Sequence, residues 1–296
     1  MTPALPNLIV IGAMKCGTSS LHRYLDIHPE IAMSARKELD YFIPDSIDQR
    51  GAGPELRLMK ERSNWERGAG WYAEHFDAAA AVRGESSVAY LFPWYPDVAE
   101  WIGTSLPDVR LIAVLRHPLE RAISHHRQLA ERDGRDLTAA LTAESSPYLA
   151  ASRYATALGP FRDRFDSDRL LLVRHGALLF NRRETLRRIF EFLGVQPDYW
   201  RPEMSRERNR SAVKGPSYRI AEQLRAGPLG PLADRVPAAI RDRGERLLAR
   251  SNPAPSPSLD ADVARRLLDA LEPEIAAIEG FTGWDLAAWR ELPRPQ

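Results

Sequence analysis

Short, continuous apolar runs recur along the chain and predict buried strands. Residues 8–11 read Leu-Ile-Val-Ile and end at Gly12, and residues 111–115 read Leu-Ile-Ala-Val-Leu and end at Arg116. Runs of this length, with β-branched residues and no polar alternation, are typical of strands that are covered on both faces of a parallel sheet. We therefore expect at least two central strands of such a sheet.

A helix is predicted after each of these strands. Leu21, Tyr24 and Leu25 recur at helical spacing after the first strand, and Thr18 or Ser19 is a suitable N-cap. The strand at residues 111–115 is likewise followed by apolar residues at helical spacing, with a proline at a favourable early position.

Alternating strands and helices predict an α/β fold, with a mainly parallel sheet flanked by helices and a ligand site at the carboxyl ends of the strands. A further amphipathic helix is expected from Val263 to Ile278. We expect residues 1–296 to form a single domain, because the Pro/Ser run at residues 252–258 is typical of a surface connection.

Composition narrows the class of protein. Of the 296 residues, 44% are hydrophobic and 27% charged, as in soluble globular proteins. The net charge is +1, which argues against a nucleic-acid partner. Cys16 is the single cysteine, so an intrachain disulfide is excluded and a cytoplasmic location is expected. No run approaches the roughly 18 to 20 apolar residues of a transmembrane helix, so we expect no such segment. The sequence leaves the oligomeric state open.

The first predicted strand leads into a glycine-flanked loop that suits an anion. The loop runs from Gly12 to Gly17 and contains Lys15. Free backbone N–H groups and the positive end of the next helix point at whatever lies above such a loop, and the lysine adds a full charge. The phosphate loop GxxxxGK[ST] has its lysine after the second glycine, where this chain has Thr18. The pattern predicts a phosphate site that only partly matches the triphosphatase loop.

Arg116 lies where the second predicted strand ends. Metal-dependent phosphoryl-transfer enzymes commonly hold magnesium with an aspartate at such a position. A guanidinium selects a second phosphate instead, because it is a fixed cation with parallel donors. Ser124, about two helical turns further on, adds a hydroxyl donor. The two motifs together predict two phosphate sites and no metal.

Both motifs resemble those of the sulfotransferases that use 3′-phosphoadenosine 5′-phosphosulfate (PAPS), especially the heparan-sulfate-type and related bacterial branch. Residues 12–21 resemble that family's 5′-phosphosulfate loop, and residues 115–124 resemble its 3′-phosphate motif. Weaker matches are spread along the chain, at residues 37–42, 84–90, 169–174, 185–194 and 283–286. The resemblance covers nearly the whole chain and is strongest over residues 8–42 and 82–129.

The resemblance implies that PAPS is the co-substrate. The residues that match the family's nucleotide-binding positions are Lys15, Gly17, Thr18, Ser19, Arg116 and Ser124. Glu38 matches the proposed catalytic base, and Lys15 would also donate to the bridging oxygen of the leaving phosphate. A basic loop closes over the nucleotide in this family, and Arg210 and Lys214 are its weaker candidates here. No metal is required.

Two positions depart from the family pattern. Asp40 stands where a histidine is common, and Ser86 stands where a lysine is common. Both fall on the expected acceptor side, and the missing cation argues against a highly sulfated polysaccharide. The expected acceptor is a small molecule, glycolipid or carbohydrate that receives the sulfuryl group on a hydroxyl, with an amine as the less favoured group.

Two alternatives stay open. A P-loop nucleotide kinase would need a lysine after Gly17 and a carboxylate that holds the metal, and Thr18 and Arg116 stand against it. A nucleotide-binding module without turnover is the second alternative, and the departures at Asp40 and Ser86 are in its favour.

Overall fold

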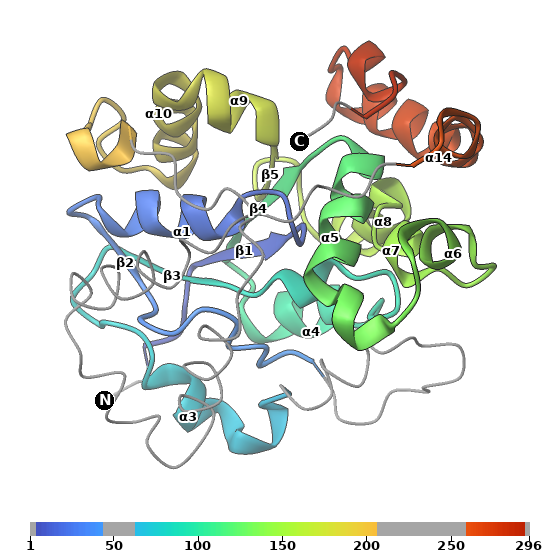
Figure 1. Cartoon of the computed structure of the whole chain (residues 1–296). Coiled ribbons are helices and arrows are strands. Elements are labelled where there is room, and N and C mark those ends of the chain that lie inside the picture. The colour runs from blue at the N-terminus through green and yellow to red at the C-terminus, as the bar shows by residue number, and fades with distance from the viewer. Residues whose placement is uncertain (1–3, 44–62, 206–258, 294–296) are drawn as a thin grey trace.

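Five parallel strands organise the part of the chain that the computed structural model describes, which comprises residues 4–43, 63–205 and 259–293. The strand order is β2-β3-β1-β4-β5, so β1 lies at the centre (Figure 1). The strands are β1 (Leu8–Gly12), β2 (Ile31–Met33), β3 (Val82–Ser86), β4 (Arg110–Leu115) and β5 (Leu170–Arg174). Every pairing is parallel, so all five carboxyl ends lie at one edge of the sheet.

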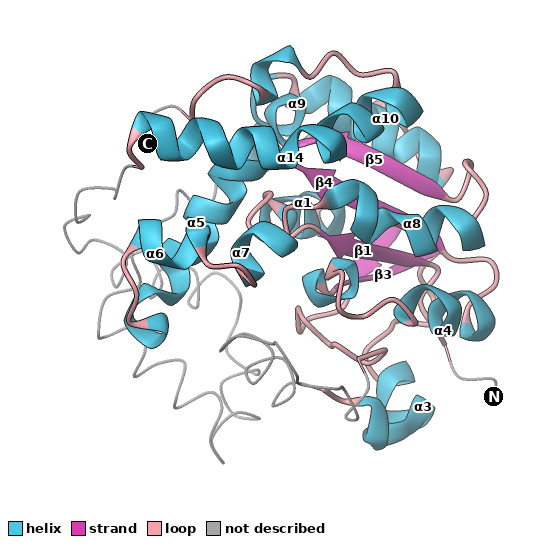
Figure 2. Ribbon diagram, turned by 90° about the vertical axis from the view of Figure 1, so that its right-hand side faces the viewer, coloured by secondary structure: helices cyan, strands magenta, loops and turns pink. Residues whose placement is uncertain are grey.

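Helices cover both faces of this sheet (Figure 2). The α-helices are α1 (Thr18–Asp26), α3 (Gly68–Ala73), α4 (Val98–Ser105), α5 (Pro118–Asp133), α6 (Leu137–Thr142), α7 (Pro147–Ala150), α8 (Tyr154–Arg164), α9 (His175–Phe180), α10 (Arg182–Leu193) and α14 (Ala261–Thr282). Single 3-10 turns are η1 (Trp65–Arg67), η2 (Val88–Leu91), η3 (Pro202–Ser205) and η4 (Ala287–Trp289).

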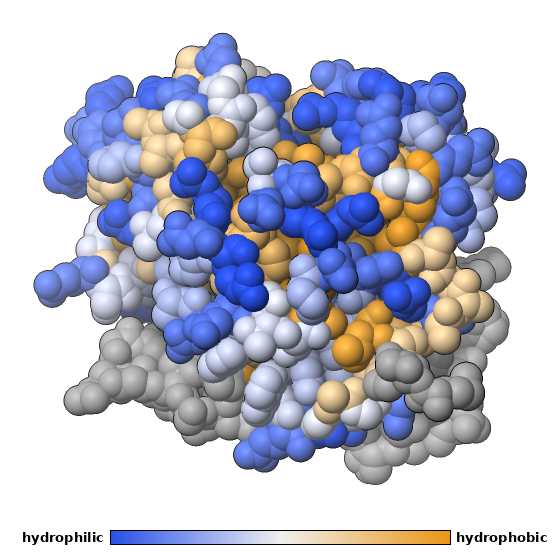
Figure 3. All heavy atoms as spheres, turned by 180° about the vertical axis from the view of Figure 1, so that it is seen from behind, coloured by the Kyte–Doolittle hydropathy of each residue, from blue (hydrophilic) through white to orange (hydrophobic). Residues whose placement is uncertain are grey.

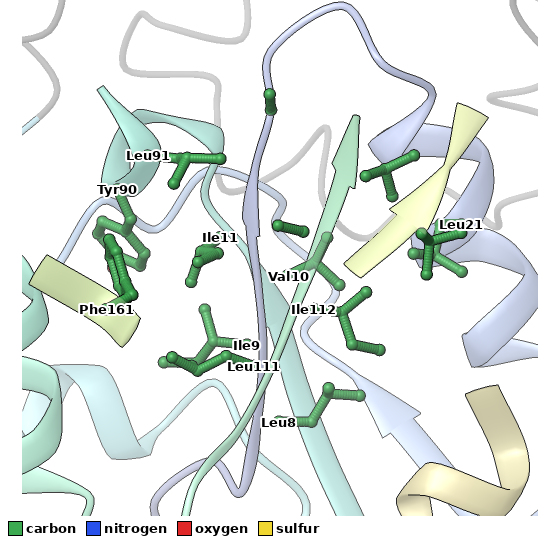
Figure 4. Packing of buried hydrophobic residues seen from close by; sticks show 14 of the residues in the cluster. Leu8, Ile9, Val10, Ile11, Leu21, Tyr90, Leu91, Leu111, Ile112 and Phe161 are labelled. Carbon is green, nitrogen blue, oxygen red and sulfur yellow. The ribbon is translucent and has the colours of Figure 1, made fainter. Parts of the chain in front are cut away.

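The central strand is apolar on both faces because a helix packs on each. All five residues of β1 are buried. Val10 points toward Leu21 of α1, whereas Ile9 points to the opposite side, where Phe161 of α8 lies (Figure 4). Successive side chains of a strand point to opposite faces. The continuous apolar run therefore records a strand that has no solvent face.

The predicted elements are present, with one local correction. The strands expected at residues 8–11 and 111–115 are β1 and β4, and the helices expected after them are α1 and α5. Gly17, rather than Thr18 or Ser19, is the N-cap of α1, and no side chain caps the helix. The loop enters the helix through a left-handed residue (φ 89°, ψ 13°), which glycine adopts without steric cost.

The expectation of a parallel α/β fold is confirmed, whereas the expectation of one domain over residues 1–296 stays a prediction.

Within the described ranges, no helix is both long and apolar enough to cross a membrane. Hydrophilic residues are interspersed with apolar areas on the face seen in Figure 3. Phe180, at the end of α9, is the most exposed large hydrophobic residue of the described part, at 86%.

Candidate functional site

The loop between β1 and α1 lies at the carboxyl edge of the sheet and is shaped by glycine. At Gly17, a Cβ would lie 3.0 Å from Cδ2 of His175, the first residue after β5. Lys15 itself has a left-handed backbone (φ 68°). Burial, followed by the charge of Arg116, lowers the pKa of His175 to about 4, so this ring is neutral at pH 7. A tight loop, a neutral ring and a nearby guanidinium thus meet at one point.

The lysine of this loop reaches across to α5. Its Nζ donates a 2.8 Å hydrogen bond to Oε1 of Gln128. Burial, then the charges of Arg121 and Lys15, holds the pKa of His125 well below its usual range. The ammonium group of Lys15 therefore lies between the phosphate-type loop and the helix that follows Arg116.

The second predicted phosphate site combines a nearly buried guanidinium with a hydroxyl that has no partner. The Arg116 side chain is 12% exposed, and its Nε and Nη2 donate to Oε2 of Glu120 at 3.0 and 2.8 Å. Ser124 is 2% exposed, and its Oγ has no hydrogen-bond partner among the residues that the structure describes. Nε of Arg127 is also buried and has no hydrogen-bond partner among the described residues. Such groups are rare in proteins and indicate a missing polar partner.

The segment that carries Glu38 lies against the start of α1. Lys37 makes the connection, because its Nζ forms an ion pair with Oε1 of Glu38 and a 3.4 Å hydrogen bond to Oγ1 of Thr18. The other oxygen, Oε2 of Glu38, accepts a 2.9 Å hydrogen bond from the amide of Val88. These two contacts fix the position of the carboxylate, and its 23% exposure leaves it accessible to an acceptor.

The two departures from the sequence pattern lie beside Glu38. Ser86 is fully buried, and its Oγ lies 2.9 Å from Nδ1 of His22. Burial, then the charge of Lys37, lowers the pKa of His22 to about 4, so this imidazole is neutral at pH 7. Asp40 is 1% exposed, and its amide donates to Oγ of Ser87. A neutral pair thus occupies the place where a lysine was expected.

The structure gathers most of the predicted residues. Lys15, Gly17, Thr18 and Ser19 form one loop and helix start, and Lys37 links Glu38 to it. The nucleotide-side residues Arg116 and Ser124 follow β4, whose carboxyl end is at the same edge of the sheet.

Two predicted residues, Arg210 and Lys214, lie outside the described residues. Within the described ranges, no group of three or more His, Cys, Asp or Glu side chains is arranged as a metal site.

Sequence reasoning missed four residues that shape the site: Lys37, His22, Gln128 and His175. Lys37 stands next to the predicted base, and that adjacency was the available signal. His175 directly follows β5, as Arg116 follows β4, so the strand-end rule that selected the arginine could also have selected the histidine. The contacts of His22 and Gln128 span 64 and 113 residues and leave no local pattern.

Comparison with known proteins places this geometry in a family. A sequence model of the sulfotransferase family matches residues 6–200. The membrane-associated sulfotransferase kil1 of Dictyostelium discoideum is 34% identical over 125 residues, which are 41% of this chain and 22% of that protein. Mouse heparan sulfate glucosamine 3-O-sulfotransferase 3B1 is 26% identical over 204 residues, which are 65% of this chain and 47% of that protein. The matches span less than half the length of either relative.

A solved structure is similar over almost the whole chain. The crystal structure of a sulfotransferase from Alicyclobacillus acidocaldarius has a TM-score of 0.70 to this structure at 26% identity. The superposition covers 97% of this chain and 100% of that one. The five-stranded parallel sheet with its flanking helices therefore matches a fold that is known for sulfotransferases.

Proposed function

Because this chain belongs to the sulfotransferase family, we propose that it transfers a sulfuryl group from PAPS to a hydroxyl of a small-molecule, glycolipid or carbohydrate acceptor. An amine is the less favoured acceptor group. The observation that carries the proposal is the pair of anion sites at one edge of the sheet, the loop with Lys15 and the motif with Arg116 and Ser124. A 3′-phosphorylated, 5′-activated nucleotide presents two separate anionic groups to such a pair.

The donor side fits a nucleotide of this kind. Around Gly17, the loop offers backbone N–H groups at a helix N-terminus, and Thr18 offers a hydroxyl. The orphaned Oγ of Ser124 and the guanidinium of Arg116 fit a second phosphate. When bound, PAPS would supply a sulfuryl group on a phosphate leaving group. Lys15 is positioned to exchange its Gln128 contact for the oxygen on which charge develops.

The acceptor side fits a proton transfer to Glu38. Its carboxylate accepts from Val88 and is paired with Lys37, so its orientation is fixed in advance. In the proposed reaction, the acceptor O–H loses its proton to Glu38, its oxygen bonds to sulfur, and the bond from sulfur to the 5′-phosphate breaks. A positioned base of this kind contributes roughly 100- to 10,000-fold in rate.

The acceptor class follows from the neutral pair of Ser86 and His22. With no lysine at position 86, the acceptor side has no cation there to attract a highly sulfated chain. The relatives include proteins named for 3-O-sulfation of heparan sulfate glucosamine and proteins named for N-sulfation of heparan sulfate, so both a hydroxyl and an amine are represented among them. A cytoplasmic location remains part of the proposal, on the basis of the single cysteine.

The alternatives are not favoured. A kinase of the P-loop type would hold magnesium with a carboxylate at the end of the second strand, where this chain has Arg116. A binding module without turnover would not require an accessible carboxylate beside the phosphate loop, yet Glu38 is held there with one oxygen on Val88.

The proposal is tested by following PAPS turnover in EDTA. Release of 3′,5′-diphosphoadenosine is measured by anion-exchange chromatography over a panel of sugar, lipid and phenol acceptors. We expect acceptor-dependent release by the wild type and at least about 100-fold slower release by Glu38→Gln. Phosphoryl transfer from ATP that requires magnesium, with no use of PAPS, would overturn the proposal.

A further inference from the structure

The carboxylate of Glu85 lies near the end of β3 and, among the residues that the structure describes, is bound only by hydroxyl donors. Its side chain is fully buried. Oε1 accepts from the hydroxyl of Tyr72 at 2.5 Å and of Tyr90 at 3.1 Å, and Oε2 accepts from Oγ of Ser87 at 2.6 Å. An ionised carboxylate only accepts hydrogen bonds. All three hydroxyl protons are therefore directed at Glu85.

Two of these hydroxyls also hold a backbone amide. Oγ of Ser87 accepts from the amide of Asp40 at 3.0 Å, and the hydroxyl of Tyr90 accepts from the amide of Phe42 at 3.3 Å. Since the proton of each hydroxyl is directed at the carboxylate, its lone pairs remain for these amides. Each hydroxyl therefore connects a backbone N–H to Glu85 through two successive hydrogen bonds.

The amides held in this way belong to the segment that carries Glu38. The amide of Glu38 itself donates to the carbonyl of Ser86 at 2.9 Å. The backbone amides of residues 38, 40 and 42 thus all donate hydrogen bonds to residues 86–90. The third hydroxyl, that of Tyr72, supports the same segment, because its ring stacks on Tyr41 with centroids 4.3 Å apart.

The segment requires such support because of its backbone. Glu38 has φ 58° and Asp40 has φ 48°, a left-handed conformation that residues with a Cβ rarely adopt. A backbone of this kind persists only where its surroundings determine it. Three contacts that hold it come from residues 86–90, and two of these pass through hydroxyls bound to Glu85. Asn64 adds a further contact, because its side-chain amide donates to the carbonyl of Leu39 at 2.9 Å.

We propose that Glu85 is a positioning residue, whose buried carboxylate orients the hydroxyls of Ser87 and Tyr90 and thereby fixes the backbone that presents Glu38 to the acceptor. Glu85 does not touch the substrate, because its side chain is fully buried. Its effect on rate rests on the proposed function of Glu38, whereas its effect on the segment does not. These two parts are therefore measured separately.

Glu85→Gln tests the proposal, because glutamine keeps the shape and replaces one acceptor oxygen by a donor. Glu274→Gln is the matched control. Glu274 is 8% exposed and accepts from the amide and the hydroxyl of Thr156 at 3.0 and 2.5 Å, in a contact between α14 and α8. The two variants thus lose comparable buried contacts, one beside the Glu38 segment and one between two helices.

The first readout is amide hydrogen exchange at pH 8 in a peptide that covers residues 36–43, with a peptide from β1 as internal reference. We expect Glu85→Gln to raise exchange in the 36–43 peptide at least tenfold and to leave β1 unchanged, whereas Glu274→Gln leaves both unchanged. Unaltered exchange of the 36–43 peptide in Glu85→Gln overturns the proposal, whether or not PAPS is turned over.

The second readout separates positioning from binding. In Glu85→Gln we expect kcat to fall about tenfold, while the Kd for 3′,5′-diphosphoadenosine stays within twofold of the wild type. If Glu85→Gln fails to fold, the exchange test uses Ser87→Ala and Tyr90→Phe instead. Each of these two relay variants removes one hydroxyl that connects Glu85 to a backbone amide. Wild-type exchange of the 36–43 peptide in both relay variants overturns the proposal. Wild-type protein that never uses PAPS would instead refute the proposed function and leave the exchange result to decide the role of Glu85.

Discussion

Replacement of Arg116 by alanine isolates the contribution of the second phosphate site. The guanidinium is 12% exposed, and its two nitrogens converge on Oε2 of Glu120. Those same donors are the ones available to a 3′-phosphate. A hydrogen bond to a charged group contributes about 1.5 to 3 kcal/mol, so loss of a bidentate contact should cost about 3 kcal/mol. That cost corresponds to roughly a 150-fold increase in Kd.

The assay compares two nucleotides that differ only in the group that Arg116 is expected to bind. Calorimetry gives Kd for 3′,5′-diphosphoadenosine and for adenosine 5′-phosphate, which lacks the 3′-phosphate. In Arg116→Ala, the first ligand should lose roughly 150-fold in affinity and the second less than about twofold. Glu120 is left without its ion-pair partner, and its repulsion of the phosphate adds to the loss for the first ligand.

Arg169→Ala is the matched control. Arg169 is 33% exposed, forms a 3.3 Å ion pair with Asp108, and immediately precedes β5, at the opposite edge of the sheet. We expect unchanged affinity for both nucleotides in this variant. Equal losses for both nucleotides in Arg116→Ala, or no loss for either, would refute the assignment of Arg116 to a 3′-phosphate.

Three further predictions concern the base, the loop and the buried carboxylate. Glu38→Gln should keep the wild-type Kd for 3′,5′-diphosphoadenosine and lose at least about 100-fold in kcat; a wild-type kcat removes the base assignment. Gly17→Ala should cost about 1 to 2 kcal/mol of unfolding free energy through its left-handed backbone and weaken nucleotide binding through the 3.0 Å approach to His175. Gly194→Ala has a similar left-handed backbone (φ 71°, ψ 29°) and open space around it, so it should show the backbone cost alone in urea unfolding. Burial raises the pKa of Glu85 from 4.5 to about 7, so the stability that its protonated form provides is complete below pH 4.5 and is lost as the pH rises through about 7. In urea unfolding, the free energy of unfolding of the wild type should fall by about 3 kcal/mol relative to that of Glu85→Gln as the pH rises through this window. Parallel pH profiles of the two free energies would contradict this prediction.

The stability cost of Glu85 and its proposed role are connected. An ionised carboxylate that accepts only from hydroxyls is unfavourable in the interior, because no cation of the described residues pairs with Glu85 to compensate its desolvation. Glutamine would relieve that charge and yet loosen the segment that carries Glu38. Global stability and local protection should therefore change in opposite directions at pH 8. Such a trade is common where a protein holds a strained functional segment.

The scaffold of the site was readable from the sequence because local signals specify it. The runs at residues 8–11 and 111–115 have no polar position, since helices cover both faces of β1 and β4. Parallel strands place their carboxyl ends at one edge, so the residues that follow them were expected to be neighbours. Lys15 and Arg116 could be selected for this reason alone.

Other features depend on contacts that no local pattern encodes. The left-handed exit at Gly17 replaced the side-chain cap expected from Thr18 or Ser19, because the loop enters the helix from a direction that only the tertiary structure sets. The chain of hydroxyls from Glu85 to the Glu38 segment joins residues 47 and 48 positions apart. Neither separation produces a periodicity in the sequence.

The most direct test of the central claim is calorimetric binding of the wild-type protein to 3′,5′-diphosphoadenosine, ADP and ATP, each without and with magnesium. The two anion sites at the edge of the sheet predict metal-independent preference for the ligand that carries a 3′-phosphate. Preference for ATP that depends on magnesium would contradict the assignment of the site to a PAPS-type donor.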